Sequence, residues 1–384
     1  MIKKRIFLCY LFCFITFISN FSLAQEGQKE KLLTFQYDSP YAVNKIIELR
    51  KNERPKNIIL MVGDGMSLSI MYTAWVANRG HLNVENCEYT GLSKTYSADH
   101  LITDSGAGGT AFATGHKTKN GSVGVDENGK PHPSILDIAG RNRLSTGLIV
   151  TCNILDATPS DFVAKISDRH EWNNIALQYV SSDVDFVFGG GWKNFKLGID
   201  GRDLTSELSD AGYKLPRSIT ELEKINEGKV FALIADDKLQ VPKLRGDVLA
   251  KASVKALELL SQNKKGFFLM IEGSMIDGYA HENNLEFVMN EMFDFDRTIG
   301  EVLKWAAKDG ETLVIVTADH ETGGWTLLGG DIASGKVSGS FSTKDHSGVM
   351  VPVYSFGPQA EIFSGIFENT ELFNKMICAY GFNN

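Results

Sequence analysis

The sequence contains few cysteines, and this limits how its fold can be stabilised. Only five of the 384 residues are cysteines. Cys9 and Cys13 lie in an N-terminal segment that we expect to be removed, which leaves Cys87, Cys152 and Cys378. At most one disulfide can form among these three, and the sequence does not say which pair it would join. A small disulfide-built fold is therefore excluded, and the chain is long enough to bury an apolar core instead.

No apolar run in the sequence reaches the roughly 20 residues that a membrane-spanning helix needs. The longest spans residues 6–21, follows the basic residues 3–5 and ends in Ser-Leu-Ala at residues 22–24. A charged start, a short apolar middle and a small-residue exit are typical of a secretory signal peptide. We therefore predict that residues 1–24 are a signal peptide cleaved after Ala24. The remaining residues 25–384 would be periplasmic or secreted, without a membrane anchor.

Basic clusters are also missing from the sequence. The formal net charge is −8, and it becomes −11 when the three cations of the signal peptide are removed. An acidic chain without basic clusters is a poor match for the phosphate backbone of DNA or RNA. We therefore expect no nucleic acid as a dedicated partner and consider metal cations the more natural ligands.

Short apolar runs rich in branched residues recur along the chain, and helix-like segments separate them. Continuous apolarity indicates strands buried on both faces, as in a parallel sheet covered by helices. Apolar residues recur at helical spacing in residues 247–262 and 285–307. We therefore predict a three-layer α/β/α sandwich with a central, mostly parallel sheet in one domain, and a surface excursion near residues 193–245. The predicted strands are residues 57–62, 147–150, 184–188, 266–271, 312–316 and 351–356.

Acidic residues follow four of these predicted strands. Asp64, Asp156, Glu272 and Asp319 each come shortly after an apolar run, and His320 follows the last of them. Each alone is more often a helix cap, a turn residue or a solvated carboxylate. The carboxyl ends of the strands in an open α/β sheet form its ligand-binding edge. Several carboxylates at that edge would repel one another unless cations neutralise them.

Histidines near further acidic residues sharpen the expectation of a metal centre. Asp277 and His281 are four residues apart, so they project from one face of a helical turn. His320 is adjacent to Asp319, and His346 precedes another predicted strand. Mixed histidine and carboxylate ligands suit zinc, whereas oxygen-only sets suit magnesium. The chain contains enough candidate ligands for two histidine-containing metal sites and one oxygen-only metal site.

The stretch LITDSGAGGTAFATGHK, residues 101–117, contains the candidate nucleophile. Ser105 opens a predicted helix whose small residues would let an anion approach its free N–H groups. A helix N-terminus and nearby cations favour Ser105 as a nucleophile. The alternatives are a phosphate-binding loop or a plain helix cap. A Walker loop is excluded, because the Gly-Lys-Ser/Thr ending is absent and His116 follows Gly115.

Six ordered motifs resemble those of the alkaline phosphatases, and the likeness covers nearly all of residues 55–358. A lone GDGM would be weak evidence, but the ordered set is highly specific. The motifs are GDGM at 63–66, TDSGAGGTAFATG at 103–115, DATPSDFVAKISDR at 156–169, EGSMIDGYAH at 272–281, VTADHETGG at 316–324 and DHSG at 345–348.

The resemblance implies a centre of two zinc ions and one magnesium ion. The first zinc would be held by three residues, Asp277, His281 and His346. The second would be held by Asp64, Asp319 and His320. Asp64 would also contribute to the magnesium site, together with Thr158 and Glu272 and with Asp156 beside it.

The resemblance also implies a reaction. Ser105 matches the phosphorylated nucleophile, Arg169 the guanidinium that holds two phosphoryl oxygens, and Asp104 a residue that positions Arg169. The expected function is hydrolysis of phosphate monoesters to an alcohol and inorganic phosphate through a phosphoserine intermediate. The alternatives are a phosphodiesterase, sulfatase or mutase of the same superfamily, or a non-catalytic secreted protein that binds zinc or phosphate. The presence of every catalytic position favours the phosphomonoesterase.

Two features depart from the family pattern. Gly278 stands where family members often have Lys or His, so we expect a changed phosphate affinity and pH optimum. Only 25 residues separate His320 from His346. The crown-like insertion near residues 325–345 is therefore short, and it offers little of the surface that a conventional dimer would use. A homodimer remains a possible assembly.

Overall fold

The computed structural model describes residues 32–198 and 201–382. The chain divides into the units Met1–Leu33 and Thr34–Asn384, and the second contains the fold described below. The predicted signal peptide lies outside the described residues. Within the described residues, no helix is both long and apolar enough to cross a membrane.

A nine-stranded sheet forms the centre of the second unit, in the order β14-β3-β13-β8-β2-β7-β4-β5-β6. The six strands from β8 to β6 run parallel to their neighbours. β13 is antiparallel to both β8 and β3, and β14 is parallel to β3. The prediction of a mostly parallel sheet is confirmed. The strands are β2 (Asn57–Gly63), β3 (Tyr89–Lys94), β4 (Ser145–Asn153), β5 (Phe186–Gly190), β6 (Val230–Leu233), β7 (Phe267–Gly273), β8 (Thr312–Thr317), β13 (Val351–Phe356) and β14 (Gly365–Glu368).

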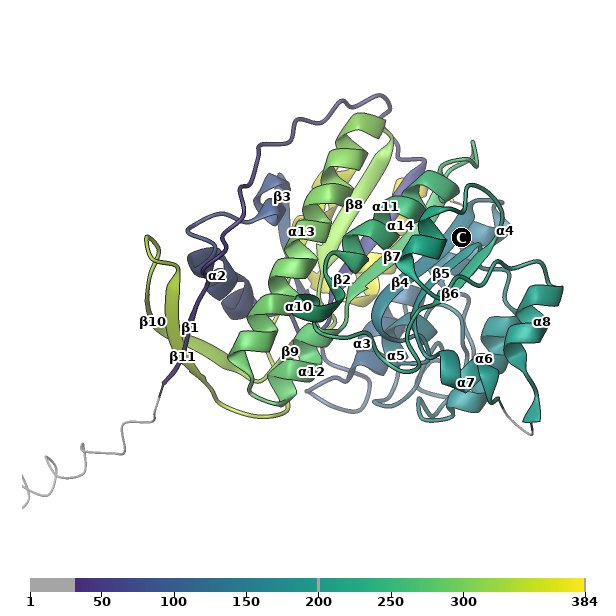
Figure 1. The fold of residues 1–384 in the computed structure, drawn as a ribbon, viewed down its shortest axis with the longest axis horizontal. Coiled ribbons are helices and arrows are strands. Elements are labelled where there is room, and N and C mark those ends of the chain that lie inside the picture. Colours follow the sequence, from purple (N-terminus) through teal and green to yellow (C-terminus); the bar gives the residue numbers. More distant parts are fainter. Residues whose placement is uncertain (1–31, 199–200, 383–384) are drawn as a thin grey trace, which may run out of the picture. The chain divides into compact units, whose positions relative to one another are not determined.

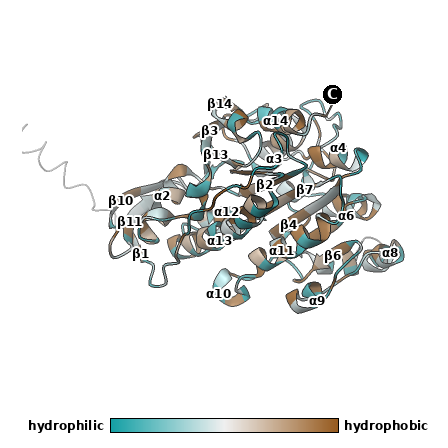
Figure 2. Cartoon of the chain, turned by 90° about the horizontal axis from the view of Figure 1, so that it is seen from above, coloured by the Kyte–Doolittle hydropathy of each residue, from teal (hydrophilic) through white to brown (hydrophobic). Residues whose placement is uncertain are grey.

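Helices cover both faces of this sheet, as the continuous apolar runs predicted. Ile59 and Met61 of β2 contribute to a core shared with α2, α11 and α13, while Ile58 and Leu60 contribute to a second core with α3, α4 and α14. Figure 2 shows the sheet between α3 and α14 on one side and α11 and α13 on the other. The main helices are α2 (Leu68–Ala77), α3 (Ser105–Thr114), α4 (Ile135–Arg141), α5 (Ala157–Ser160), α6 (Trp172–Ser181), α11 (Val248–Leu260), α12 (Met275–His281), α13 (Leu285–Asp309) and α14 (Thr370–Tyr380).

The segment predicted as a surface excursion, residues 193–245, also contributes to the sheet, and here the prediction is incomplete. Its strand β6 is fully buried and pairs with β5. The apolar run of β6 has only four residues and charged neighbours, so it is too short to show periodicity. The rest of the region holds α7 (Trp192–Lys196), α8 (Leu204–Asp210), α9 (Ile219–Glu223) and α10 (Pro242–Arg245).

The predicted insertion near residues 325–345 is a β-hairpin. Strands β10 (Trp325–Asp331) and β11 (Lys336–Phe341) pair antiparallel, and β1 (Leu33–Gln36) adds a third strand beside β11 (Figure 1). The Trp325 indole donates a hydrogen bond of 2.8 Å to Thr73 Oγ1 of α2. This contact and the buried Val337 hold the hairpin against α2.

Two short strands bring the end of the hairpin back toward the sheet. β9 (Glu321–Thr322) and β12 (His346–Ser347) pair antiparallel, with His346 opposite Thr322. Because β9 follows directly after β8, this pairing places His346 near the carboxyl edge of the sheet. The remaining short elements are the 3-10 helices η1 (Asn83–Asn86) and η3 (Ala360–Phe363).

The three cysteines of the predicted mature chain are free. Cys87 is partly buried, Cys152 is buried and Cys378 is exposed. The fold of the described residues therefore rests on apolar packing without a disulfide between these cysteines.

Two strand-end glycines make room for Phe295 of α13. A Cβ on Gly273 would lie 2.8 Å from a ring carbon of Phe295, and a Cβ on Gly63 would lie 3.1 Å from another. These glycines flank two predicted metal ligands, because Gly63 precedes Asp64 and Gly273 follows Glu272. Close packing of α13 thus fixes the positions of the strand ends that carry these two ligands.

We expect Gly273→Ala to lower the free energy of unfolding by about 1–3 kcal/mol, because the added methyl group overpacks the contact with Phe295. Gly140→Ala is the matched control, since a Cβ there meets nothing within 4 Å and Gly140 lies inside a helix. It should raise stability by up to about 1 kcal/mol. Urea unfolding of the metal-free variants measures both effects. Equal stabilities of the two variants would contradict the packing explanation.

Candidate active site and metal centre

The predicted site residues meet at the carboxyl edge of the sheet. Strands β8, β2, β7 and β4 are parallel neighbours, so their carboxyl ends lie at the same edge. Asp319, Asp64, Glu272 and Asp156 stand at or just beyond these ends. This is the edge at which open α/β sheets bind ligands.

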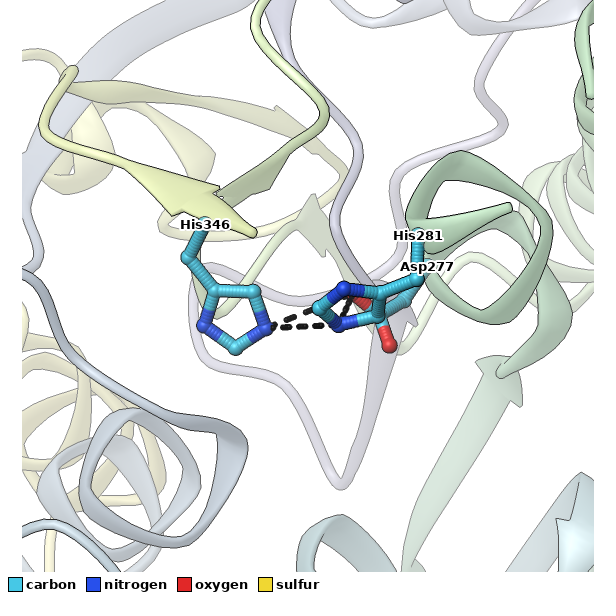
Figure 3. A group of neighbouring side chains, drawn as sticks. All are labelled: Asp277, His281 and His346. Carbon is cyan, nitrogen blue, oxygen red and sulfur yellow. Dashed lines mark hydrogen bonds and ion pairs between the residues drawn. The ribbon is translucent and has the colours of Figure 1, made fainter. Parts of the chain in front are cut away.

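A first group of possible metal ligands consists of Asp277, His281 and His346. Their ligand atoms all lie within 4.8 Å of one another. Asp277 Oδ1 is 3.3 Å from His281 Nε2 and 3.5 Å from His346 Nε2. Asp277 and His281 come from α12, whereas His346 comes from β12 (Figure 3). His346, 65 residues after His281, thus converges with two side chains of α12 on one point.

The two histidines of this group face each other through their Nε2 atoms, which are 3.1 Å apart. Their Nδ1 atoms are already engaged with backbone carbonyls, of Lys344 for His281 and of Thr103 for His346. A carbonyl can only accept, so each Nδ1 carries a hydrogen and each neutral ring directs its Nε2 lone pair at the other. Two opposed lone pairs beside a carboxylate need either a proton or a cation between them.

A second group consists of Asp64, Asp277 and His320, whose ligand atoms also lie within 4.8 Å of one another. His320 Nε2 is 3.5 Å from Asp64 Oδ1 and 3.1 Å from Asp319 Oδ2. The structure therefore places the three residues predicted for the second zinc together. It also shows that Asp277, predicted only for the first zinc, lies between the two groups.

The charges of this edge fit bound cations. Asp64 Oδ1 and Asp319 Oδ2 are buried and have no hydrogen-bond partner in the described part of the chain. Burial raises the pKa of Asp64 well above its ordinary value, and the charges of Asp319 and Asp277 raise it further. A buried carboxylate oxygen that accepts no hydrogen bond is unfavourable, and a metal ion would compensate for it.

The oxygen-only set lies on the β4 and β7 side of the edge. Asp156 is the N-cap of α5 and Thr158 lies in that helix, while Glu272 lies in β7. Glu272 is only 1% exposed, and burial together with the charge of Asp319 raises its pKa to about 8. An oxygen-only donor set in a buried acidic position suits magnesium. The sequence did not predict that Cys152 lies beside this set, where its sulfur is 3.8 Å from Glu272 Oε2.

The candidate nucleophile opens α3 beside the second group of ligands. Ser105 Oγ lies 3.2 Å from His320 Nε2, and the residue is buried. Asp104 caps the helix, because its carboxylate accepts a 2.9 Å hydrogen bond from the backbone N–H of Ala107. Ser105 thus sits at the positive end of a helix next to residues able to hold a cation.

Asp104 also connects the nucleophile helix to Arg169. Its Oδ2 accepts hydrogen bonds from Arg169 Nη1 at 3.0 Å and from the backbone N–H of Gly121 at 2.9 Å. The backbone N–H of Arg169 donates in turn to the Gly121 carbonyl at 2.7 Å. These contacts hold Arg169 at both its backbone and its guanidinium group.

Gly278, the residue after Asp277, packs against the side chain of Met275. A Cβ at this position would lie 2.5 Å from the terminal methyl carbon of Met275. A side chain at residue 278 would therefore require Met275 to move.

Comparison with known proteins identifies the family. A family model described as alkaline phosphatase matches residues 55–339. The chain belongs to the alkaline phosphatase family. Alkaline phosphatase 4 of Bacillus subtilis (strain 168) is 32% identical, with 83% of this chain and 87% of that protein covered. The alkaline phosphatase of Escherichia coli (strain K12) is 30% identical, with 85% of this chain and 86% of that protein covered.

Solved alkaline phosphatases share the fold. The alkaline phosphatase from the Antarctic bacterium TAB5 has a TM-score of 0.83 and 38% identity, with 86% of this chain and 100% of that chain covered. A mutant of the TAB5 alkaline phosphatase, solved with magnesium bound in a site designated M3, has a TM-score of 0.82 and 36% identity, with 87% and 100% covered. The α/β fold predicted from the sequence is therefore confirmed as alkaline-phosphatase-like, and the protein is a phosphatase.

Binding of a metal ion should become tighter as the pH rises toward about 9. Hydrogen bonding to Asp277 raises the pKa of His281 to about 9 in the metal-free protein. Below that pH His281 holds a proton, which an incoming metal ion must displace. Competition with a chelator at several pH values measures the affinity. An affinity that stays constant between pH 7 and 9, over which the proton concentration falls roughly 100-fold, would contradict this role of His281.

Proposed function

We propose that this phosphatase hydrolyses phosphate monoesters by transferring the phosphoryl group first to Ser105 and then to water. The observation that carries the proposal is the position of Ser105 Oγ. It lies at the N-terminus of α3, 3.2 Å from His320 Nε2, where a candidate metal ligand, a helix dipole and Arg169 converge. Family membership supports phosphomonoester hydrolysis, and the geometry supports the covalent route.

We further propose that the centre holds two zinc ions and one magnesium ion. The opposed histidines, and the carboxylate oxygens that accept no hydrogen bond from the described residues, support two zinc ions. These would be held by Asp277, His281 and His346 and by Asp64, Asp319 and His320. The buried oxygen donors of Asp64, Thr158 and Glu272, with Asp156 beside them, support magnesium. When bound, such ions stabilise negative charge on the attacking and leaving oxygens.

The chain's own residues would carry out two displacements. In the first, Ser105 Oγ attacks phosphorus, the bond between phosphorus and the ester oxygen breaks, and the alcohol leaves with a proton. In the second, water attacks the phosphoserine, the bond between phosphorus and Ser105 Oγ breaks, and Ser105 regains a proton while phosphate is released. Each step replaces one P–O bond with another, so no oxidant or reductant is needed.

Arg169 would bind the phosphoryl group during both steps. Asp104 occupies Nη1 of its guanidinium group, which leaves further N–H donors for two nonbridging oxygens. A monoester offers these oxygens more readily than a diester, whose second substituent occupies one of them. The Arg169 geometry therefore favours monoesters.

The experiment that tests this function measures phosphate release from an aryl phosphate monoester and the matching diester. The protein is first stripped of metal and then supplied with zinc, magnesium or both. We expect monoester turnover that zinc restores and magnesium increases. Preference for the diester would contradict the proposal and assign the chain a phosphodiesterase activity.

Ser105→Ala separates the covalent mechanism from metal binding. We expect the loss of nearly all turnover, on the order of 10³-fold or more, with unchanged zinc and magnesium content. Ser253→Ala is a control, because the buried Ser253 hydroxyl donates to the backbone carbonyl of Leu249 within α11. It should cost about 1 kcal/mol of stability and keep its activity. Full activity in Ser105→Ala would exclude the phosphoserine route.

We also propose that residues 1–24 direct export and that the protein acts in the periplasm or outside the cell. Support comes from the charged start, apolar middle and small-residue exit of this segment. Intact mass of the protein recovered from a secreting host should correspond to a chain that begins at Gln25. Recovery of the full-length chain in the cytoplasm would contradict the proposal.

A further inference from the structure

Asp161 is a buried carboxyl group that the proposed mechanism does not use. It follows α5, three residues after Thr158, and its side chain is 0% exposed. Oδ1 accepts a 2.7 Å hydrogen bond from the hydroxyl of Thr110. Oδ2 has no hydrogen-bond partner within the described ranges. Such a group is unfavourable in a core, so its presence calls for a reason other than stability.

The unpartnered oxygen of Asp161 lies directly against the backbone of the nucleophile helix. A Cβ on Gly109 of α3 would be only 1.9 Å from Asp161 Oδ2. Glycine is thus required at this position, and the carboxyl group occupies the space that a side chain would take. Because buried atoms in such close contact resist sliding, Asp161 fixes how α3 sits on the segment after α5.

The hydrogen bond from Thr110 extends this contact to a third segment. Thr110 Oγ1 also accepts a 2.8 Å hydrogen bond from the backbone N–H of Gly124. The same loop holds Gly121, which binds both Asp104 and the backbone of Arg169. Asp161 therefore connects α5 to the helix that begins with Ser105 and, through Thr110, to the loop that holds Arg169.

We propose that Asp161 is a positioning residue for phosphoryl transfer. It acts through Gly109 and Thr110 to set the place of Ser105 relative to Arg169 and to Thr158 of the oxygen-only site. The inference rests on the proposed function, because it assigns Asp161 a role in that reaction. The positions of the reacting groups matter strongly, since a displacement of about 1 Å can lower a rate about 100-fold.

The test uses two matched pairs of variants in the metal-loaded protein. Asp161→Asn keeps an oxygen that accepts from Thr110, whereas Asp161→Ala removes it. Thr110→Ser keeps the hydroxyl group, whereas Thr110→Val removes it at nearly constant shape. Asp296→Asn is a structural control: Asp296 is a buried carboxylate on α13 that accepts hydrogen bonds from Asn83, Val84 and Tyr41, away from this network. For each variant kcat, KM, metal content and Tm are measured with an aryl phosphate.

We expect Asp161→Ala and Thr110→Val to lower kcat about 10- to 100-fold, with smaller changes in KM and unchanged metal content. Asp161→Asn and Thr110→Ser should stay within about threefold of the wild type, and Asp296→Asn should lower Tm without lowering kcat. A kcat within about twofold of the wild type in both Asp161→Ala and Thr110→Val, with only Tm reduced, would overturn the proposal.

The wild-type protein in the same assay distinguishes this inference from the proposed function. If the wild type turns over the monoester and the variants do not differ from it, only the role of Asp161 fails. If the metal-loaded wild type shows no monoester turnover, the proposed function fails, and the role of Asp161 fails with it. If Asp161→Ala does not fold, Thr110→Val decides alone: a kcat within about twofold of the wild type in that variant then overturns the proposal.

Discussion

The carboxylates at the edge of the sheet cannot all remain charged without cations between them, and the rest of the site depends on this constraint. Asp64 and Asp319 each have a buried oxygen without a hydrogen-bond partner among the described residues. Burial raises the pKa of both Asp64 and Glu272. The opposed Nε2 atoms of His281 and His346 add a second demand for positive charge. Metal binding should therefore contribute to the stability of the folded state as well as to chemistry.

A rigid scaffold is needed to hold such mutually repelling groups. The strands that carry them are buried on both faces, so packed side chains on both sides of the sheet restrict their movement. α13 packs against the ends of β2 and β7 through Phe295, where Gly63 and Gly273 allow close approach. The packing energy of two apolar cores thus keeps the carboxylates in place before any ion is bound.

The two sides of the candidate site are positioned by different parts of the chain. Candidate metal ligands come from strand ends, from α12 and from the short β9–β12 pair, with Asp277 shared between two groups. The side that holds the candidate nucleophile is organised by polar contacts instead, because Asp104 joins α3, the Gly121 loop and Arg169. The contact between Asp161 and Gly109 packs α3 against the segment that follows α5.

The sequence by itself determined the α/β fold class and six of the nine strands of the large sheet, and it predicted candidate site residues that the structure brings to one edge of that sheet, because buried strands need continuous apolar runs and their polar ends stand out. It could not determine that β13 runs antiparallel, since an apolar run carries no direction. It also missed β3, β6 and β14, and of these β6 and β14 have only four residues each, too few to show a period. Only the tertiary structure decided that Asp277 lies between two ligand groups, that His281 and His346 face each other and that Asp161 meets Gly109. These contacts join residues far apart in the sequence, and their distances depend on how helices, strands and loops pack together.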